Sequence, residues 1–245
     1  MQNHPYFIAT KKVVLAHRGF TPPAENTLGA FAHAIDAGAD YIETDVRATA
    51  DSVAVLFHDE DLKRLTGSTL KIEHLTFDQI RQYIEVPKLE DALRKFPQMK
   101  FNLDIKSKDA ILPTVKAIEK TSSHNRVLVS SFSNKRRVRT LNLLSRAVAT
   151  SASGSIVIKA WVMSKVGIKL EGLMSGIGAL QIPISMYGLR FDTGRFVKSV
   201  TDTGTFIHFW TINKESEMRR LMELGAHGIV TDKTDLAVKT LQKFK

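Results

Sequence analysis

Acidic, basic and imidazole side chains gather at or near the ends of three apolar, strand-like runs in the first part of the chain. The first run ends at His17 and Arg18, the second contains Glu43 and Asp45, and the third ends at His58. Alternate residues of a strand face the same side, so Glu43 and Asp45 share a face, with their Cα atoms about 6.6 Å apart. Two carboxylates on one face repel each other unless a cation or protons lie between them. The spacing therefore predicts a site for one hard divalent cation, Mg²⁺ or Ca²⁺.

The neighbouring side chains indicate the chemistry that such a cation would assist. The pKa of histidine suits proton transfer near neutral pH, so His17 and His58 are candidates for the general base and the general acid, in either order. The guanidinium of Arg18 can bind a phosphate through paired N–H donors. Carboxylates for a metal, histidines for protons and an arginine for phosphate together indicate metal-assisted phosphoester chemistry.

A fourth apolar run, residues 101–106, supplies further candidates. Alternation places Asn102, Asp104 and Lys106 on one face, as in the interior of a barrel. Asp104 is a candidate for a third acidic metal ligand, and Lys106 for a contact to the phosphate or to the charge of its transition state. The alternative is that Asp104 and Lys106 form an ion pair inside the barrel.

The order of these residues resembles the signature of the glycerophosphodiester phosphodiesterase family. The resemblance rests on the following segments, in this order: His17-Arg18-Gly19, Glu25-Asn26-Thr27, Gly38-Ala39-Asp40, Glu43 with Asp45, His58-Asp59 and Leu62-Lys63-Arg64-Leu65-Thr66. It continues more weakly almost to the C-terminus. The chain departs from the family pattern at Asp104, where the family usually has glutamate. It also departs in the loop around Pro22-Pro23, which is about one residue shorter.

This resemblance implies a TIM barrel that hydrolyses glycerophosphodiesters to glycerol phosphate and an alcohol. It also implies that attack on phosphorus comes from the substrate's own glycerol hydroxyl, through a cyclic phosphate that water then opens. Intramolecular attack benefits from proximity. The sequence alone leaves direct attack by water open.

Four more residues have expected places. Trp210 should point inward near the end of its strand, either as an apolar wall for a glycerol or alkyl group or as a core aromatic. Asn26 could order the loop after His17 or approach the site, although we expect it to cap the helix that follows. His208, deeper in the same strand as Trp210, is expected to be a core histidine with its polar atoms satisfied. His227 lies in a helix–strand joint with no partner in view.

Strand-like and helix-like runs alternate along the whole chain, which is typical of an α/β protein with a parallel sheet. The expected strands are 13–18, 41–46, 101–106, 127–132, 147–152, 179–184, 206–212 and 228–232, with 53–58 as an extension of the second. The expected helices are 26–37, 74–83 with 89–95, 109–121, 134–145, 156–170, 193–202, 215–223 and 234–244. The pattern predicts a (β/α)₈ barrel whose site lies at the C-terminal ends of the strands.

The chain has no Gly-, Ser- or Pro-rich linker, so we expect residues 1–245 to form a single domain with a short insertion after the second strand, within residues 59–98. A short internal sequence repeat supports a fold of repeated units, because residues 38–45 resemble residues 225–232. Each copy reads as the end of a helix followed by a strand with Thr-Asp near its end. We interpret this repeat as a common helix-to-strand connection rather than as a sign of shared chemistry.

Composition limits the partners and the compartment. The excess of 35 Lys and Arg over 25 Asp and Glu favours anionic partners such as phosphoesters or lipid head groups, although a basic host proteome explains it equally well. No basic patch with interleaved aromatics indicates nucleic-acid binding. Cysteine is absent, no apolar stretch reaches the ~18 residues of a membrane span, and the first residues lack a signal-peptide core. These features predict a cytoplasmic enzyme.

Two alternatives to a glycerophosphodiester phosphodiesterase stay open at this point. A lysophospholipase D-like enzyme acting on membrane lipids would suit the short segment 59–98 and the positive charge, and would touch the membrane from its surface. A non-catalytic phosphate-binding barrel is disfavoured, because all the expected acids and both histidines are present. The head group and the oligomeric state are not predicted.

Overall fold

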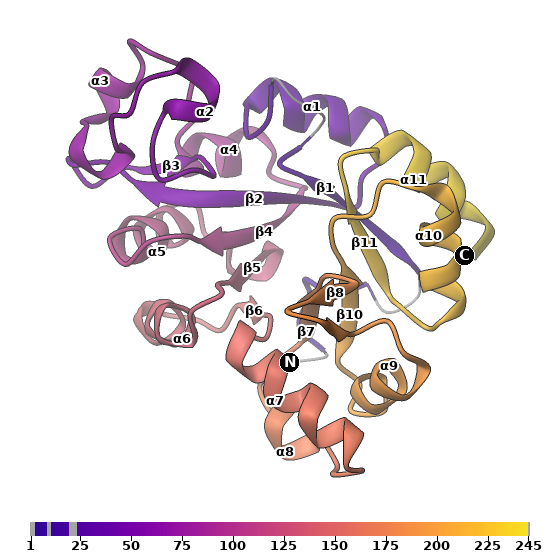
Figure 1. Cartoon of the computed structure of the whole chain (residues 1–245). Helices are drawn as coiled ribbons and strands as arrows, with labels where there is room; N and C mark the ends of the chain where they lie inside the picture. The colour runs from indigo at the N-terminus through magenta and orange to yellow at the C-terminus, as the bar shows by residue number, and fades with distance from the viewer. Residues whose placement is uncertain (1–2, 9–10, 20–23, 245) are drawn as a thin grey trace.

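Eight parallel strands form a ring in the computed structural model, which describes residues 3–8, 11–19 and 24–244 (Figure 1). The strands are β1 (Val13–His17), β2 (Tyr41–Ala48), β4 (Lys100–Ile105), β5 (Val127–Ser130), β6 (Ala149–Thr150), β7 (Ala179–Ile182), β10 (Phe206–Phe209) and β11 (Gly228–Thr231). They follow the order β6-β5-β4-β2-β1-β11-β10-β7. Between β6 and β7, the N–H of Gly178 donates to the carbonyl of Thr150 at 3.0 Å and that of Ala152 to Ala179 at 2.9 Å. The chain therefore folds as a nearly closed (β/α)₈ barrel, and this prediction is confirmed.

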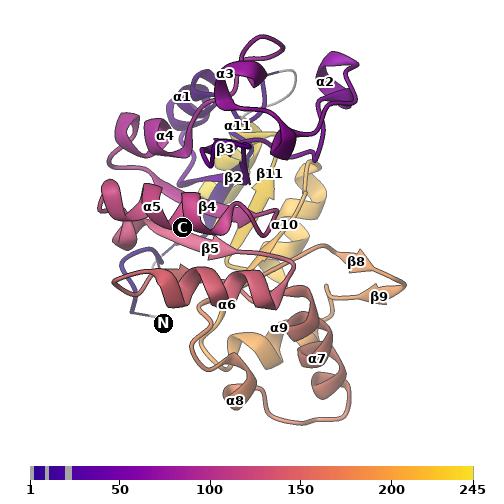
Figure 2. The same ribbon diagram turned by 90° about the vertical axis from the view of Figure 1, so that its left-hand side faces the viewer.

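Helices cover the outside of the ring (Figures 1 and 2). The longer ones are α1 (Leu28–Asp36), α4 (Leu89–Lys95), α5 (Ile111–Lys120), α6 (Asn134–Leu143), α7 (Gly154–Lys165), α9 (Gly194–Thr201), α10 (Glu215–Glu223) and α11 (Thr234–Leu241). Single turns occur at α2 (Lys63–Thr66), α3 (Phe77–Ile80), α8 (Glu171–Met174) and three 3₁₀ segments, Ile72–His74, His124–Arg126 and Gln242–Phe244. No helix in the described part of the chain is long and apolar enough to cross a bilayer.

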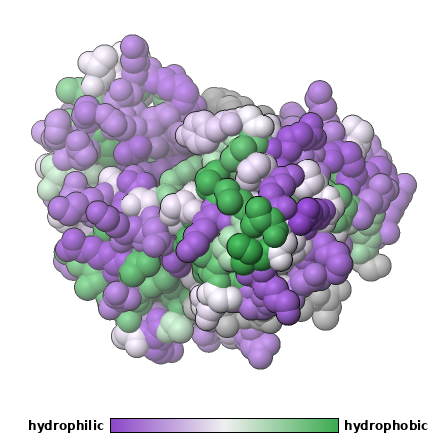
Figure 3. Space-filling view, turned by 60° about the horizontal axis from the view of Figure 1, so that its bottom comes forward, coloured by the Kyte–Doolittle hydropathy of each residue, from purple (hydrophilic) through white to green (hydrophobic). Residues whose placement is uncertain are grey.

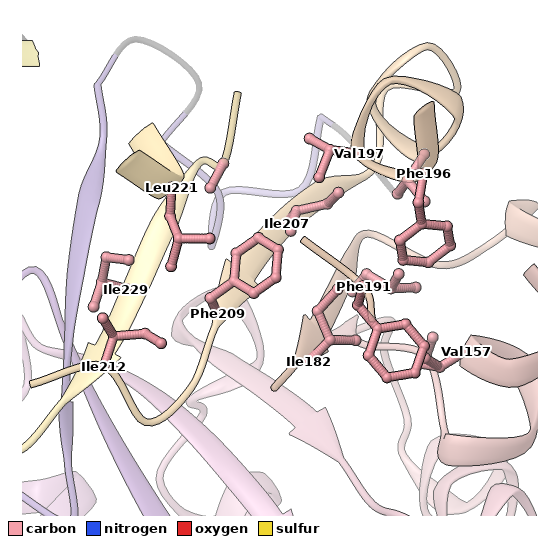
Figure 4. Packing of buried hydrophobic residues seen from close by; sticks show 14 of the residues in the cluster. Val157, Ile182, Phe191, Phe196, Val197, Ile207, Phe209, Ile212, Leu221 and Ile229 are labelled. Atoms are coloured by element: carbon pink, nitrogen blue, oxygen red, sulfur yellow. The ribbon is translucent and has the colours of Figure 1, made fainter. Parts of the chain in front are cut away.

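The two faces of the strands carry different side chains, as a period of two requires. Outward residues such as Ile207, Phe209 and Ile229 pack against the helices, and Figure 4 shows them in one layer with Leu221 and Val197. Inward residues near the N-terminal ends form a separate apolar floor. That floor contains Tyr6, Val13, Leu15, Tyr41, Leu128, Ala149, Ala179, Phe206 and Val230. Above the floor, many inward positions are polar, among them Glu43, Asp45, Asn102 and Asp104, so the C-terminal end of the barrel can hold charged groups.

The insertion follows β3 (Ala54–Leu56), which pairs antiparallel with the far end of β2 through Val46↔Leu56 and Ala48↔Ala54. The expected extension of the second strand is therefore confirmed. A small apolar cluster of its own holds the segment together. Its buried members are Val55, Phe57, Leu62, Ile72, Leu75, Ile80 and Val86.

Several expected boundaries are wrong. The helix expected over 74–83 is reduced to the single turn of α3, and the strands expected over 147–152 and 206–212 cover only Ala149–Thr150 and Phe206–Phe209. The helix expected over 156–170 ends at Lys165, because Gly167 adopts a left-handed backbone (φ 75°) that turns the chain towards α8. The strand expected over 179–184 ends at Ile182 and is followed by an unforeseen hairpin, β8 (Ser185–Met186) and β9 (Leu189–Arg190). Its two-residue turn, Tyr187-Gly188, has positive φ at both positions, as in a type I′ turn. The shortened loop with Pro22 and Pro23 lies outside the described residues.

Candidate active site

A cavity of about 260 Å³ opens at the C-terminal ends of the barrel strands. All of the site residues predicted from the sequence line it: His17, Arg18, Glu43, Asp45, His58, Asp104, Lys106 and Trp210. They come together because the parallel register aligns the strand ends. In the register of β1 and β2, His17 lies opposite Glu43, and in the register of β2 and β4, Asp45 lies opposite Asp104.

Three buried carboxylates line the cavity, and the pKa values of Glu43 and Asp45 shift in opposite directions. Burial, and next the negative charge of Asp45, raise the pKa of Glu43 to about 7. Burial acts in the same direction on Asp45, but the positive charges of Lys106 and Arg18 outweigh it and hold the pKa of Asp45 below its usual value. Positive charge therefore compensates burial at Asp45 but not at Glu43.

The ammonium of Lys106 bridges two carboxylates at the centre of the site. Its Nζ lies 2.8 Å from Oδ1 of Asp45 and 2.7 Å from Oδ2 of Asp104. Burial alone would lower the pKa of Lys106, but Asp104 and Asp45 outweigh burial and raise it above its usual value. The ion pair that the sequence left as an alternative for Asp104 and Lys106 is thus present, with Asp45 as its third member.

Arg18 follows β1 with a positive φ of 54° and is held from three sides. Its backbone N–H donates to Oε2 of Glu43 at 3.2 Å, and its Nη1 donates to Oε1 of Glu25 at 3.0 Å. Its Nε lies 3.2 Å from Oδ2 of Asp45 without the alignment of a hydrogen bond. The guanidinium is therefore oriented in the cavity wall by acidic residues.

His17 is oriented by a carboxylate from the last strand end. Its Nδ1 lies 2.6 Å from Oδ1 of Asp232, while its Nε2 lies 3.9 Å from Oε2 of Glu43. Burial lowers the pKa of His17, but the bond to Asp232 and the charge of Glu43 outweigh it, so the net pKa is raised. Asn213 fixes Asp232 in turn, since its Nδ2 donates to Oδ2 of Asp232 at 2.7 Å and its Oδ1 accepts from the Asp232 N–H at 2.9 Å.

The imidazole of His58 is likewise bound to a carboxylate. Its Nδ1 lies 2.8 Å from Oδ1 of Asp59, and Oδ2 of Asp59 accepts from Nε of Arg64 at 2.6 Å. Arg64 also contacts Glu25, the partner of Arg18. A chain of alternating charges therefore connects His58 to Arg18 along the rim.

Asn26 belongs to this network, and its predicted role as a helix cap is wrong. The cap of α1 is Thr27, whose hydroxyl accepts from the N–H of Ala30 at 3.1 Å. Asn26 is buried with φ of 58°, donates from Nδ2 to Oδ2 of Asp45 at 3.2 Å, and accepts from Oγ1 of Thr44 at 2.7 Å. A residue in the left-handed region at this position turns its amide back to β2 instead of along the helix.

One side of the cavity is apolar. Trp210 is half-buried there and meets the ring of Phe132 edge-on, with centroids 6.1 Å apart. The apolar lining continues through Val157, Ile182, Pro183 and Met186. Trp210 thus lines the cavity and also packs on the inner apolar cluster, while its role as a wall for a glycerol or alkyl group stays a prediction.

Comparison with known proteins agrees with this geometry. Residues 17–236 match the model of the glycerophosphoryl diester phosphodiesterase family. The chain belongs to this family. It is therefore a phosphoric diester hydrolase, a glycerophosphodiester phosphodiesterase.

A curated relative and two solved structures illustrate the likeness of this phosphodiesterase to others. The probable glycerophosphodiester phosphodiesterase 2 of Mycobacterium tuberculosis is 38% identical over 235 residues, which cover 92% of this chain and 89% of the relative. The glycerophosphodiester phosphodiesterase of Thermotoga maritima has a TM-score of 0.74 at 26% identity, covering 93% of this chain and 97% of that one. A phosphodiesterase of Oleispira antarctica, solved with its product sn-glycerol-3-phosphate, has a TM-score of 0.76 at 24% identity, covering 95% and 97%, and supports the fold alone.

The sequence did not point to every residue of the site in this phosphodiesterase. Asp232 and Asn213 were missed, although the Thr-Asp repeat at 231–232 was the signal that could have found Asp232. Two expectations about other histidines are wrong. His208 is buried with no hydrogen-bond partner for Nδ1 among the described residues, and burial lowers its pKa to about 3. His227 does have a partner, because its Nδ1 accepts from the N–H of Ile207 at 3.1 Å.

The acidic side chains suit a divalent cation by their chemistry and their placement. Glu43, Asp45 and Asp104 face one cavity with oxygen donors, and burial together with the charge of Asp45 raises the pKa of Glu43, which a bound cation would offset. Among the described residues, no three His, Asp or Glu side chains are already arranged around one point as metal ligands. The ammonium of Lys106 lies between two of the acids, so a cation bound by all three would require this side chain to move.

Proposed function

We propose that this phosphodiesterase cleaves glycerophosphodiesters to glycerol phosphate and an alcohol by general acid–base catalysis with His17 and His58. The observation that carries the proposal is the matched support of the two imidazoles. Each uses Nδ1 to bind a carboxylate, Asp232 or Asp59, and both side chains line one cavity. In each ring Nε2 is therefore left as the atom that can exchange a proton with a substrate.

The two protons move in opposite directions. One histidine takes a proton from the attacking hydroxyl as its oxygen bonds to phosphorus. The other gives a proton to the alcohol oxygen as its bond to phosphorus breaks. We propose that the attacking group is the substrate's own glycerol hydroxyl, so that a cyclic phosphate forms first and water then opens it, because intramolecular attack avoids the entropic cost of positioning a free water molecule.

The cations of the site bind the phosphate. Arg18 presents a guanidinium held by Glu25 and Asp45, which suits it to the two oxygens of a phosphate. Lys106 stands beside it at the end of β4. Trp210, with the apolar lining around it, provides a wall for the glycerol or alkyl part of the substrate.

We propose further that Glu43, Asp45 and Asp104 hold one Mg²⁺ or Ca²⁺ ion. When bound, such an ion supplies Lewis acidity to a phosphate oxygen and neutralises the carboxylates. Glu43 supports this role best, because its pKa of about 7 reflects a buried carboxyl beside Asp45 with too little positive charge around it. A cation at the acids would also release Lys106 from them, which would leave its ammonium free to contact the phosphate.

The test is release of glycerol phosphate from glycerophosphocholine by the purified chain. We expect turnover with Mg²⁺ or Ca²⁺, loss of turnover in excess chelator, and recovery when the cation is returned. His17→Ala and His58→Ala should each lose turnover by about 10² or more, whereas His74→Ala, an exposed histidine outside the cavity, should not. Near-normal rates in both site variants would exclude the acid–base assignment, and full activity in chelator would exclude the cation.

A lysophospholipid is a second candidate substrate. The apolar wall formed by Phe132, Met186 and Trp210 also suits a lysophospholipid, whose glycerophosphodiester carries an acyl chain. Parallel assays with glycerophosphocholine and lysophosphatidylcholine separate the two. A substrate whose 2-hydroxyl is methylated tests the cyclic route, since direct attack by water would still cleave it.

A further inference from the structure

Helix α7 exposes apolar side chains on the face that it turns away from the barrel. Val157, Ala160 and Ser164 are buried against the fold, but Val162 on the opposite side is 50% exposed. Val166 and Ile168, just after the helix, are 66% and 54% exposed. A helix on the outside of a soluble barrel normally presents polar residues there. Exposed apolar side chains that lie together indicate a surface made for contact.

The hairpin β8–β9 continues this surface towards the mouth of the cavity. Trp161 of α7 donates from Nε1 to the carbonyl of Arg190 at 2.9 Å, which fixes the hairpin to the helix. Tyr187 at the hairpin tip is 89% exposed. Figure 2 shows the hairpin projecting beside α7, and Figure 3 turns forward the face that carries α7, α8 and α9, with apolar side chains gathered near its centre. We call Val162, Val166, Ile168 and Tyr187 the lip.

The charge of the chain is concentrated in the same part of the sequence. Residues 120–170 contain ten Lys and Arg residues and no Asp or Glu, so this stretch alone accounts for the net charge of +10. The ten are Lys120, Arg126, Lys135, Arg136, Arg137, Arg139, Arg146, Lys159, Lys165 and Lys169. Of these, only Lys120 lies within salt-bridge distance of a carboxylate in the described residues. Lys159, Lys165 and Lys169 are exposed next to the lip, and Glu171 is the first acid that follows.

We propose that the lip docks on a lipid bilayer that contains anionic phospholipid. Apolar side chains flanked by lysines suit the boundary between head groups and acyl chains. There, burial of the apolar side chains and attraction of the lysines to anionic head groups both favour binding. A second copy of this chain is a poorer occupant. A symmetric dimer through the lip would bring Lys159, Lys165 and Lys169 of both copies together, with no acid in the stretch to neutralise them.

The lip lies on the apolar side of the cavity, which gives docking a consequence for the substrate. Met186 of the hairpin lines the cavity, and so does Phe132, which is 56% exposed. An apolar path therefore runs from Trp210 to the outer surface. Docking would bring this opening to the bilayer, where a lipid phosphodiester can enter with its acyl chain on the apolar side. This consequence rests on the proposed function, whereas docking itself does not.

Co-sedimentation with vesicles tests the docking of the full chain. We expect binding to phosphatidylcholine vesicles that contain about a quarter phosphatidylglycerol, at least about tenfold weaker binding to phosphatidylcholine alone, and weaker binding at high salt. The variant Lys159→Glu/Val162→Glu should lower the partition coefficient by about tenfold or more. The matched control Leu112→Glu/Lys116→Glu likewise changes one exposed apolar residue and one exposed lysine to glutamate, on α5, and should bind as the parent does.

Three results would overturn the proposal. They are equal binding to both kinds of vesicle, unchanged binding of the α7 variant, and light scattering that shows a dimer which this variant dissociates. Turnover of glycerophosphocholine in water keeps the test separate from the proposed function, because the α7 variant should retain it. Vesicle binding without any turnover in the parent chain would refute the proposed function and leave the docking surface intact.

Discussion

The imidazole of His17 is bound by Asp232, a residue 215 positions later in the chain, with 2.6 Å between Nδ1 and Oδ1. The contact exists because β11 pairs with β1, with Thr231 opposite Ala16. Closing the ring of strands thus does more than complete a core. It brings the last strand end of the barrel to the first and thereby orients one of the two proposed proton carriers.

Replacing Asp232 by asparagine should lower the pKa of His17, because the variant keeps a polar partner but removes the negative charge that raises the pKa. The limb of the pH profile of kcat/KM that belongs to His17 should move to lower pH. We expect kcat to fall roughly 10- to 100-fold, a part of the 10²–10⁴ that general acid–base catalysis supplies. NMR titration of the His17 ring gives the pKa without reference to activity.

Asn213→Ala is the control for this prediction. It removes the amide that binds Asp232 at 2.7 Å but leaves the carboxylate charge in place. The pKa of His17 should therefore move less than in Asp232→Asn. An unchanged pKa of His17 in Asp232→Asn would mean that the carboxylate only packs against the ring.

The raised pKa of Glu43 predicts a pH-dependent stability. A carboxyl group whose pKa is about 7 in the folded chain and about 4.5 when exposed destabilises the fold above pH 4.5, and the full cost is present above pH 7. Glu43→Gln should therefore raise Tm at pH 8 and leave it nearly unchanged at pH 4.5, while abolishing turnover. Thermal melts at both values of pH measure this difference.

Added Mg²⁺ provides the internal check on the same variant. If Glu43 helps to hold the cation, Mg²⁺ should raise the Tm of the parent chain at pH 8 and should raise that of Glu43→Gln much less. An equal rise in both proteins would place the cation away from Glu43.

The buried amide of Asn26 should matter for activity more than for the helix that follows it. Asn26→Ala removes the contacts to Thr44 and Asp45, so kcat/KM should fall by about tenfold through a misplaced carboxylate. Thr27→Ala removes the true cap of α1 and should cost about 1 kcal/mol of the free energy of unfolding with little effect on kcat. Urea unfolding and steady-state kinetics on both variants separate the two roles.

The sequence was sufficient to predict the barrel and the charged residues at the centre of its cavity, because both depend on short-range periodicity. Because side chains alternate along β2 and β4, Glu43, Asp45 and Asp104 all face inward. Parallel pairing of the two strands then places these residues next to one another near the strand ends. No long-range information is needed for that step. The residue types indicated phosphoester chemistry, the family resemblance indicated the substrate class, and the structure added the carboxylate partner of each imidazole.

The partners of the charged groups could not be predicted from the sequence. Lys106 bridges Asp45 and Asp104 only because β2 and β4 are neighbours in a given register, and a flexible side chain can choose among several acids within reach. The hairpin that carries Tyr187 could not be predicted from the sequence for another reason. Its strands are two residues long, too short for any alternation to show, and only the two-residue turn identifies it.

Asp104 offers the sharpest test of the site, because the family usually has glutamate there. Asp104→Glu lengthens the arm by one methylene and keeps the charge, so Lys106 retains both carboxylate partners and kcat/KM should stay within about threefold of the parent. Asp104→Asn keeps the shape but removes the charge. If Asp104 holds the cation, this variant should need about tenfold more Mg²⁺ for half-maximal activity. A Mg²⁺ titration identical to that of the parent would show that Asp104 serves only Lys106, and complete loss of activity in Asp104→Glu would show that the shorter arm is required.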